Sequence, residues 1–320
     1  MREVATVVGL PAPVPPRRPF LIMNPQSGGG KVDRFGLVRK ARALNADVAL
    51  LEGAGTVDVA ALAREAADDG ADLLGVAGGD GTQSLVAAVA ADRGIPFMVI
   101  AAGTRNQFAR DLGLDSEDPA ACLAALTDGV EVRVDLGRIG DRSFVTSAAF
   151  GAYAELVRTT AFRDGDTAAA LALLPSLLAA PDEQRLNLRT GDTVVGDSAA
   201  VLVSNNPYGA ADIAGLGRRN RLDRGVLGLL AVTLRGARDA VRLVRGRRSG
   251  LVKVSTATEA VIETDADRIP VGVDGEEVTL ATPVHCAIRP GVLRVRVPRL
   301  RPGVRPGVRG TRVHTAMVGT

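Results

Sequence analysis

Short apolar runs alternate with amphipathic stretches through the first third of the chain. The apolar runs predict strands at 19–24, 47–52, 71–77 and 96–102. Between them, apolar residues recur at helical spacing, which predicts helices at 32–44, 57–68 and 82–91. Three of the four predicted strands end in a turn that contains glycine. The alternation predicts a parallel sheet flanked by helices, with ligands bound at the carboxyl ends of the strands.

The pattern changes near Glu131 to one that favours strands. Alternating apolar positions predict strands at 132–136 and 144–150, and two helices follow at 153–162 and 168–178. The remainder predicts further strands at 186–189, 198–204, 226–232, 251–255, 260–263, 271–273 and 292–297. Residues 238–247 are compatible with a basic amphipathic helix. The second part of the chain is therefore predicted to be a largely β domain.

We predict four segments along the chain. Residues 1–18 are a Pro-rich, disordered leader, 19–130 an α/β domain, 131–298 the second domain and 299–320 a basic tail. The longest uncharged stretch, residues 167–181, contains Pro175. Its 15 residues are fewer than the about 20 that a transmembrane helix needs, so we expect no membrane crossing.

The sequence Gly-Gly-Asp-Gly-Thr occupies residues 78–82, after a predicted strand and before a predicted helix. Such a turn directs backbone N–H groups and the positive end of the helix toward one point, which makes an anion site. The carboxylate of Asp80 would repel a phosphate group unless a divalent metal ion lay between them. The motif therefore indicates a metal–nucleotide site. A tight turn capped by Asp80 is the structural alternative.

Two other predicted strands end in similar turns. Residues 24–31 carry three consecutive glycines with Ser27 and Lys31, but they do not match a Walker A loop. The chain also lacks Gly-x-Gly-x-x-Gly after a strand, so a dinucleotide-binding fingerprint is absent. Residues 103–110 offer another turn before a helix, where Thr104 could cap the helix. A flexible loop and a plain helix cap remain the alternatives for these two segments.

Composition excludes several other functions. The chain has two Cys and two His, which rules out a disulfide framework or a zinc site and leaves no catalytic triad. Net charge is only +3, yet residues 235–248 hold six Arg and one Asp, and residues 299–312 hold five Arg and no acid. Such clusters suit phosphate or an anionic membrane surface. Because few aromatic residues accompany them, we expect no nucleic-acid partner.

Acidic residues of the second part are further candidates. Asp135 lies near the end of a predicted strand, and Asp274-Gly275-Glu276 follows an apolar run at a predicted hairpin. Asp-Gly is favoured in hairpins for structural reasons, so Asp274 is first interpreted as a turn residue. Glu276 is a functional candidate if the fold returns it to the glycine turns.

In combination, these residues resemble the diacylglycerol kinase catalytic family, which includes soluble bacterial lipid kinases and sphingosine kinases. The resemblance covers most of the chain. The motifs that carry it are Asn24-Pro25 with Ser27-Gly28, Gly-Gly-Asp-Gly-Thr at 78–82, Gly103-Thr104 with Asn106, Phe-Ala-Arg at 108–110, Asp135, Ser-Asn-Asn at 204–206 and Asp-Gly-Glu at 274–276. The second of these is shared with NAD kinases and phosphofructokinases, whereas the later motifs favour a lipid kinase.

The resemblance implies a Rossmann-like nucleotide-binding domain and a C-terminal β-sandwich, with the active site in the cleft between them. It further implies that part of the last segment returns to the first domain. The residues that it places at ATP are Asn24, Ser27, Gly28, Gly79, Asp80, Gly81, Thr82, Gly103, Thr104 and Asn106. Asp80 and Asp135 would belong to the Mg²⁺ network, and Glu276 would be the general base. Asp80, Asp135 and Glu276 are therefore the predicted catalytic residues.

Two positions depart from the family pattern. Gln107 stands where the family usually has Asp, which would weaken the electrostatic network around Mg²⁺. Arg224 stands where some members have an Asp that holds a structural Mg²⁺. We expect a salt bridge from Arg224 to Asp223 or a neighbour instead, and no structural metal there.

We predict an ATP- and Mg²⁺-dependent lipid kinase that phosphorylates a lipid alcohol, with diacylglycerol favoured as acceptor and phosphatidic acid as product. A polyprenol, a sphingoid base and a glycolipid also offer suitable hydroxyl groups. The expected location is the cytoplasm, with peripheral attachment to the anionic inner face of the membrane, and the resemblance is compatible with a homodimer. The alternatives are an NAD kinase-like or other soluble-alcohol kinase, and a non-catalytic lipid- or nucleotide-binding member of the family.

Overall fold

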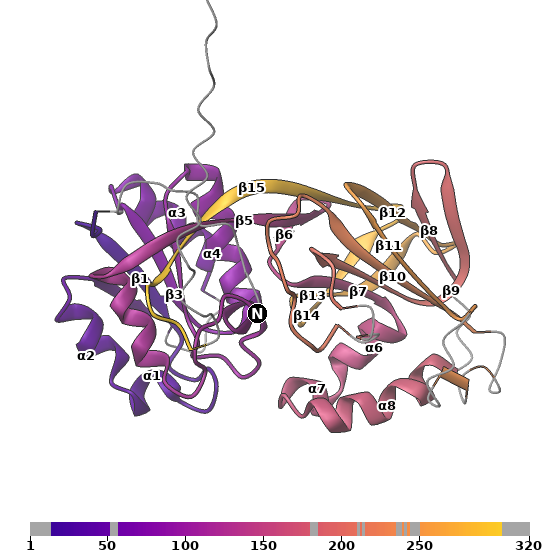
Figure 1. The fold of residues 1–320 in the computed structure, drawn as a ribbon, viewed down its shortest axis with the longest axis horizontal. Helices are drawn as coiled ribbons and strands as arrows, with labels where there is room; N and C mark the ends of the chain where they lie inside the picture. Colours follow the sequence, from indigo (N-terminus) through magenta and orange to yellow (C-terminus); the bar gives the residue numbers. More distant parts are fainter. Residues whose placement is uncertain are drawn as a thin grey trace, which may run out of the picture.

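A long pair of antiparallel strands joins two differently built halves of the molecule (Figure 1). The computed structural model describes residues 14–51, 57–179, 185–209, 212, 215–234, 239, 242–243 and 250–302. The predicted leader up to residue 13, most of the basic segment 235–248 and the tail from residue 303 lie outside the described residues. The basic helix considered for 238–247 also falls largely outside them.

The first half alternates strands and helices, as predicted. Its elements are β1 (Pro19–Met23), α1 (Lys31–Arg34), α2 (Leu37–Arg42), β2 (Asp47–Leu50), α3 (Val59–Asp68), β3 (Leu73–Ala77), α4 (Asp80–Arg93), β4 (Phe97–Ile100), α5 (Gln107–Asp111) and the 3₁₀ helix η1 (Pro119–Leu126). Strands β2, β1, β3 and β4 pair in that order, all parallel. The predicted parallel sheet flanked by helices is therefore confirmed.

Strands β1, β3 and β4 of this sheet are largely buried on both faces. Leu21, Ile22, Leu74 and Val76 have no exposed surface, and they share a core with residues of α2, α3 and α4. Apolar residues at successive positions are typical of parallel strands covered by helices on both sides. The carboxyl ends of β1, β3 and β4 therefore meet at one edge of a rigid sheet, where the glycine turns begin.

Two predicted helices are interrupted in the structure. The helix predicted at 32–44 is split into α1 and α2 at Gly36, which has φ 61°. The helix predicted at 153–162 is split at Thr159, which has the extended values φ −68° and ψ 147°. The Thr159 side chain accepts a hydrogen bond from the Phe162 N–H at 3.3 Å and so caps the next helix. Each interruption depends on the backbone dihedral angles of one residue. The spacing of apolar residues carries no information about these angles.

The second half is built mainly of antiparallel strands, with three helices near its start. Its elements are β5 (Gly129–Ile139), β6 (Arg142–Phe144), β7 (Ser147–Gly151), α6 (Ala152–Arg158), α7 (Thr160–Arg163), α8 (Thr167–Ala179), β8 (Leu186–Thr190), β9 (Thr193–Asn205), β10 (Leu227–Thr233), β11 (Val252–Ala257), β12 (Glu259–Glu263), β13 (Arg268–Val273), β14 (Glu276–Ala281) and β15 (Val284–Pro298). Side chains from β7, β9 and β12, including Phe150, Val203 and Ile262, meet in one buried cluster. This arrangement agrees with the predicted β-sandwich.

The helices α6 and α8 cover the outer face of β9 and β10. Leu174 and Leu178 of α8 pack with Tyr153 and Leu156 of α6 in a separate buried cluster. Leu171 and Leu173 of α8 are exposed by 44% and 40%. Within the described part of the chain, none of the helices has both the length and the apolar character needed to cross a membrane.

Strand β15 carries the chain back from the second half to the first. It pairs with β5 in two stretches separated by an irregularity between Arg289 and Leu293, and its end pairs in parallel with β4 through Val295 and Phe97. Beyond the strand, the Arg301 Nη1 donates to the Leu112 carbonyl at 2.7 Å. All strands thereby belong to one continuous sheet, which fixes the two halves relative to each other.

Candidate functional site

The three glycine turns converge at the carboxyl edge of the parallel sheet. A Cβ atom on Gly28 would lie 2.4 Å from the Ala102 carbonyl oxygen, and one on Gly103 would lie 2.8 Å from the Gly78 carbonyl oxygen. Side-chain atoms do not fit at such distances, so glycine is required for the turns to touch. The residues predicted to bind ATP therefore gather in one place, although they come from three separate segments.

Two of the residues predicted to bind ATP stabilise the turns in which they lie. The Asn24 Oδ1 accepts the Gln26 N–H at 3.0 Å. The Asn106 side chain donates to the Gly103 carbonyl at 2.6 Å and accepts the Gly103 N–H at 2.7 Å, with φ 50° at Asn106 itself. Asn tolerates this left-handed conformation better than most residues. Their side-chain amides thus stabilise the turns whose backbone would face a ligand.

Gly79 differs from its neighbours because nothing in the described chain requires a glycine there. No atom lies within 4 Å of a Cβ built at this position. Its φ of −71° and ψ of 169° suit any residue. The open space next to this backbone is what a phosphate group needs to approach the N–H groups of a turn.

The Asp80 carboxylate is held in a fixed orientation. It is 8% exposed, and its Oδ2 and Oδ1 accept the N–H groups of Gln107 and Phe108 at 3.1 and 3.0 Å. These N–H groups begin α5, so Asp80 ties the second glycine turn to the third. Burial raises the pKa of Asp80, and the two backbone hydrogen bonds oppose that rise.

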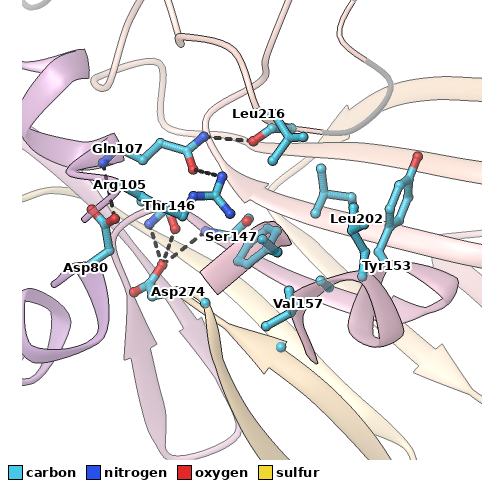
Figure 2. A pocket seen from close by; sticks show the side chains of 16 residues that line it. Asp80, Arg105, Gln107, Thr146, Ser147, Tyr153, Val157, Leu202, Leu216 and Asp274 are labelled. Carbon is cyan, nitrogen blue, oxygen red and sulfur yellow. Dashed lines mark hydrogen bonds between the residues drawn. The ribbon is translucent and has the colours of Figure 1, made fainter. Parts of the chain in front are cut away.

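Asp80 lines a small cavity together with Asp274, as Figure 2 shows. We call it the Asp80 cavity; its volume is about 30 Å³. Asp274 lies at the β13–β14 hairpin with φ 49°, and its carboxylate accepts the N–H groups of Val145, Thr146 and Ser147. Burial raises its pKa to about 6. Asp274 is thus the turn residue that the sequence indicated, and it also lies beside Asp80, which the sequence did not indicate.

The pair Asp80 and Asp274 fits a hard divalent cation. Mg²⁺ is commonly held by one or two carboxylates together with substrate phosphates. Both carboxylates line one cavity, and burial makes each of them costly to ionise without a compensating positive charge. Among the described residues, no group of three or more His, Cys, Asp or Glu side chains gathers as a metal site.

Asp135 does not line the Asp80 cavity, although it was expected to share a metal ion with Asp80. Its carboxylate accepts the Asn206 side-chain amide at 2.9 Å and the N–H groups of Gly225 and Gly291 at 2.6 and 2.8 Å. Gly291 belongs to the irregularity in β15. The structure therefore places Asp135 where β5 and β15 meet Asn206 and Gly225, and it is Asp274 that lies beside Asp80.

The expected salt bridge between Arg224 and Asp223 is replaced by another contact. Asp223 accepts hydrogen bonds from Arg221 Nε and Nη2 at 2.8 and 3.0 Å. The backbone N–H of Arg224 donates to Asn206 Oδ1 at 2.8 Å. Arg221, which precedes Asp223 in the same loop, is thus the cation that neutralises Asp223.

Glu276, at the start of β14, is returned to the glycine turns. A Cβ atom on Gly81 would lie 2.1 Å from Glu276 Oε1, so the carboxylate packs directly on the Gly-Gly-Asp-Gly-Thr segment. Both residues line a cavity of about 420 Å³, the Glu276 cavity, which also includes Arg142. Burial raises the pKa of Glu276, and the Arg142 charge opposes that rise. The condition for a functional Glu276 is therefore met.

Gln107 makes hydrogen bonds that an aspartate could not make. Its Nε2 donates to the Tyr208 hydroxyl and to the Gly215 carbonyl, both at 2.7 Å, and more weakly to the Gly217 carbonyl at 3.3 Å. A carboxylate in this position would face carbonyl oxygens and repel them. The departure from the family pattern is thus matched by its surroundings.

A buried ion pair links the two halves beside the site, and sequence analysis missed it. Arg219 and Asp111 both have fully buried side chains, and Arg219 Nε donates to Asp111 Oδ2 at 2.8 Å. Arg219 Nη1 also donates to the carbonyls of Val145 and Asn205 at 2.8 and 2.6 Å. Burial raises the pKa of Asp111 even beside this cation. The two residues lie 108 positions apart, so no local pattern connects them.

Comparisons with known proteins agree with this arrangement. The family model "Diacylglycerol kinase catalytic domain" matches residues 18–139. A diacylglycerol kinase of Mycobacterium tuberculosis is 29% identical over 297 residues, which cover 87% of this chain and 94% of that protein. A diacylglycerol kinase of Bacillus subtilis is 37% identical over 101 residues, which cover 31% of this chain and 33% of that protein. The predicted resemblance is therefore confirmed.

The fold is similar to that of a solved structure. The crystal structure of a diacylglycerol kinase from Bacillus anthracis superposes with a TM-score of 0.64 and 20% sequence identity, covering 88% of this chain and 96% of that one. At this identity the likeness concerns the fold. It confirms the predicted combination of a helix-flanked parallel sheet with a second region of antiparallel strands.

Proposed function

Because the chain belongs to the diacylglycerol kinase catalytic domain family, and so to the lipid kinases, we propose that it transfers the γ-phosphate of ATP to the hydroxyl group of diacylglycerol. The product would be phosphatidic acid. The relatives above are diacylglycerol kinases, which favours this acceptor over other lipid alcohols. Residues 19–130 would bind the nucleotide, and residues 131–298 would bind the acceptor.

The observation that carries the proposal is the contact between Glu276 and Gly81. It brings a carboxylate of the second half onto the turn where a nucleotide phosphate would bind. The cavity that these residues line, at about 420 Å³, lies within the usual range of about 300–1,000 Å³ for ligand pockets. A base next to a phosphoryl donor site is the arrangement that phosphoryl transfer to a hydroxyl group needs, and the contact between Glu276 and Gly81 supports it.

The proposed reaction is a direct transfer. The lipid hydroxyl oxygen attacks the γ-phosphorus, and the bond from that phosphorus to the β–γ bridging oxygen breaks. ADP leaves with the electron pair, and Glu276 accepts the hydroxyl proton. Burial raises the pKa of Glu276, which makes it a stronger base than an exposed glutamate.

The nucleotide would be held mainly by the backbone N–H groups of the three turns. Asn24 and Asn106 would act by shaping these turns, and Thr82 and Thr104 offer hydroxyl groups beside them. Mg²⁺ would be held by Asp80 and Asp274 with phosphate oxygens, and it would neutralise charge on the phosphates. Asp135 keeps a positioning role in this proposal, because it does not line the Asp80 cavity and instead holds Asn206, Gly225 and Gly291 together.

Attachment to the anionic inner face of the cytoplasmic membrane completes the proposal, because the acceptor is a lipid. The Arg-rich segments at 235–248 and 299–312 support it by their charge. Each Arg near an anionic surface contributes about 1 kcal/mol to binding.

The decisive experiment replaces Glu276 by Gln and measures transfer from γ-labelled ATP, with Mg²⁺, to vesicles containing diacylglycerol. We expect turnover to fall by about 10²–10⁴-fold, because general base assistance has that magnitude. The affinity for ATP should stay within twofold of wild type. Labelled phosphatidic acid from wild-type protein would support the function, and its absence with every lipid of a mixed extract would reject it.

Glu277→Gln is the matched control. Glu277 is the next residue in β14, and it forms an ion pair with Arg158 at 3.4 Å instead of lining the Glu276 cavity. Its replacement should leave turnover within twofold of wild type. Equal losses in the two variants would remove Glu276 from the role of base.

A further inference from the structure

Arg105 lies at the junction of two cavities beside the candidate site. It follows Thr104 in the third glycine turn and lines the Asp80 cavity, where Figure 2 shows its guanidinium group next to Gln107. It also lines a second cavity of about 150 Å³, the Thr104 cavity, together with Thr104, Arg110 and Ser116. No sequence motif had singled out this side chain.

The guanidinium group of Arg105 is held from two sides. Its central carbon lies 3.6 Å from the centre of the Phe162 ring, which belongs to the second half of the molecule. Its Nη2 donates to Gln107 Oε1 at 3.3 Å. Stacking on an aromatic ring and a hydrogen bond at one edge fix a planar cation without neutralising it.

The remaining terminal nitrogen of Arg105 is buried and lacks a hydrogen-bond partner among the described residues. A buried charged donor without a partner is unfavourable, because it has lost water and gained nothing in return. The position of Arg105 next to the cavities suggests that a ligand supplies the missing acceptor.

The charges around Arg105 compensate its positive charge only in part. Asp80 is the carboxylate that acts on it, but both Asp80 oxygens already accept backbone N–H groups. The positive charge of Arg110 repels that of Arg105. At Nη2, the neutral amide of Gln107 stands where the family usually has a carboxylate. The substitution therefore keeps Arg105 from being neutralised by its neighbour.

The Thr104 cavity has the lining that a phosphate group requires. Arg105 and Arg110 supply positive charge, and Thr104, Ser116 and Thr167 supply hydroxyl groups. Lys31 approaches the same wall, where its Nζ donates to the Ser116 carbonyl at 2.8 Å. Bonds from a guanidinium group to phosphate are charge-assisted and can be bidentate, which makes Arg the favoured residue for this contact.

We propose that Arg105 binds a phosphate group during the reaction, through the nitrogen that has no protein partner. The inference rests on the proposed kinase function and adds a ligand contact to it. Two phosphate groups share the required chemistry: the γ-phosphate of ATP before transfer, and the phosphate of phosphatidic acid after it.

The test compares wild type with Arg105→Met and Arg105→Lys. Calorimetry with MgATP and MgADP measures nucleotide affinity, and inhibition by short-chain phosphatidic acid measures product affinity. If Arg105 holds the γ-phosphate, Arg105→Met should lower the affinity for MgATP at least tenfold and the affinity for MgADP much less. If it holds the product phosphate, the inhibition constant of phosphatidic acid should rise at least tenfold with ATP affinity unchanged. Arg105→Lys, which retains the charge, should recover part of either loss.

Arg93→Met serves as the matched control, because Arg93 pairs with Asp68 on the surface and lines none of the three cavities. Both affinities should remain at the wild-type value in this variant. If Arg105→Met binds MgATP and phosphatidic acid as wild type does, the inference fails while the kinase function stands. If wild type binds neither, both fail together.

Discussion

Replacing Arg219 by Met should destabilise the protein strongly and make its stability depend on pH. The Arg219 guanidinium group forms a fully buried ion pair with Asp111. Its Nη1 also donates to the carbonyl groups of Val145 and Asn205 in the second half. The substitution leaves the Asp111 carboxylate buried without its cation. Breaking a buried ion pair in this way costs about 3–5 kcal/mol of unfolding free energy.

The pH dependence has a definite sign. Burial already raises the pKa of Asp111, and without Arg219 two interactions that lower it disappear. The native state of the variant then binds a proton that the unfolded state releases above about pH 4. The free energy of unfolding should therefore fall as pH rises, so the loss relative to wild type should be larger at pH 8 than at pH 5.

Urea denaturation followed by circular dichroism, at pH 5 and pH 8, measures both effects. Arg93→Met is again the control, because its ion pair with Asp68 is exposed and should contribute only about 0.2–1 kcal/mol. Asp111→Asn combined with Arg219→Met should recover part of the loss, since it removes the isolated charge. A destabilisation no larger than that of Arg93→Met, equal at the two pH values, would refute the argument.

Two more predictions concern the site. Gly79→Ala should leave the melting temperature unchanged, because no atom lies within 4 Å of the new Cβ, yet weaken MgATP binding. Gly103→Ala, whose Cβ would meet the Gly78 carbonyl oxygen at 2.8 Å, should instead cost about 1–3 kcal/mol of stability. Unchanged ATP affinity in Gly79→Ala would show that Gly79 does not contact the nucleotide. The Asp274 carboxyl should titrate near pH 6 by NMR, so its ionisation lowers stability as pH rises from about 4 to 6. An apparent pKa below 4 would show that its hydrogen bonds outweigh its burial.

Local sequence determined the first half of the molecule and the position of its turns. Strands such as β1 and β3 are short apolar runs, and the helices between them have one apolar face, so periodicity alone predicts both. Parallel strands place their carboxyl ends at one edge, which is why the sequence alone sufficed to group Gly28, Gly79 and Gly103. Helix breaks at Gly36 and Thr159 escaped prediction, because each depends on the dihedral angles of one residue.

The tertiary structure decided which acidic residues meet. The Asp274 N–H donates to the Ser147 carbonyl at 3.0 Å, and the pairing of β13 with β7 sets this register. The Asp135 carboxylate accepts the N–H of Gly291, which lies in the irregularity of β15. Residue type and motif spacing do not determine strand register, so they could not show which acidic residue of the second half lines a cavity with Asp80.

The same reason explains the residues that sequence analysis missed. Arg105 is held by Phe162 and Gln107, and Arg219 pairs with Asp111. The contacts of Arg105 with Phe162 and of Arg219 with Asp111 join the two halves. The sequence by itself determined the two kinds of architecture and the chemistry at the strand ends, because both follow from local patterns. The contacts that complete the site required the fold, because they arise only when distant segments pack together.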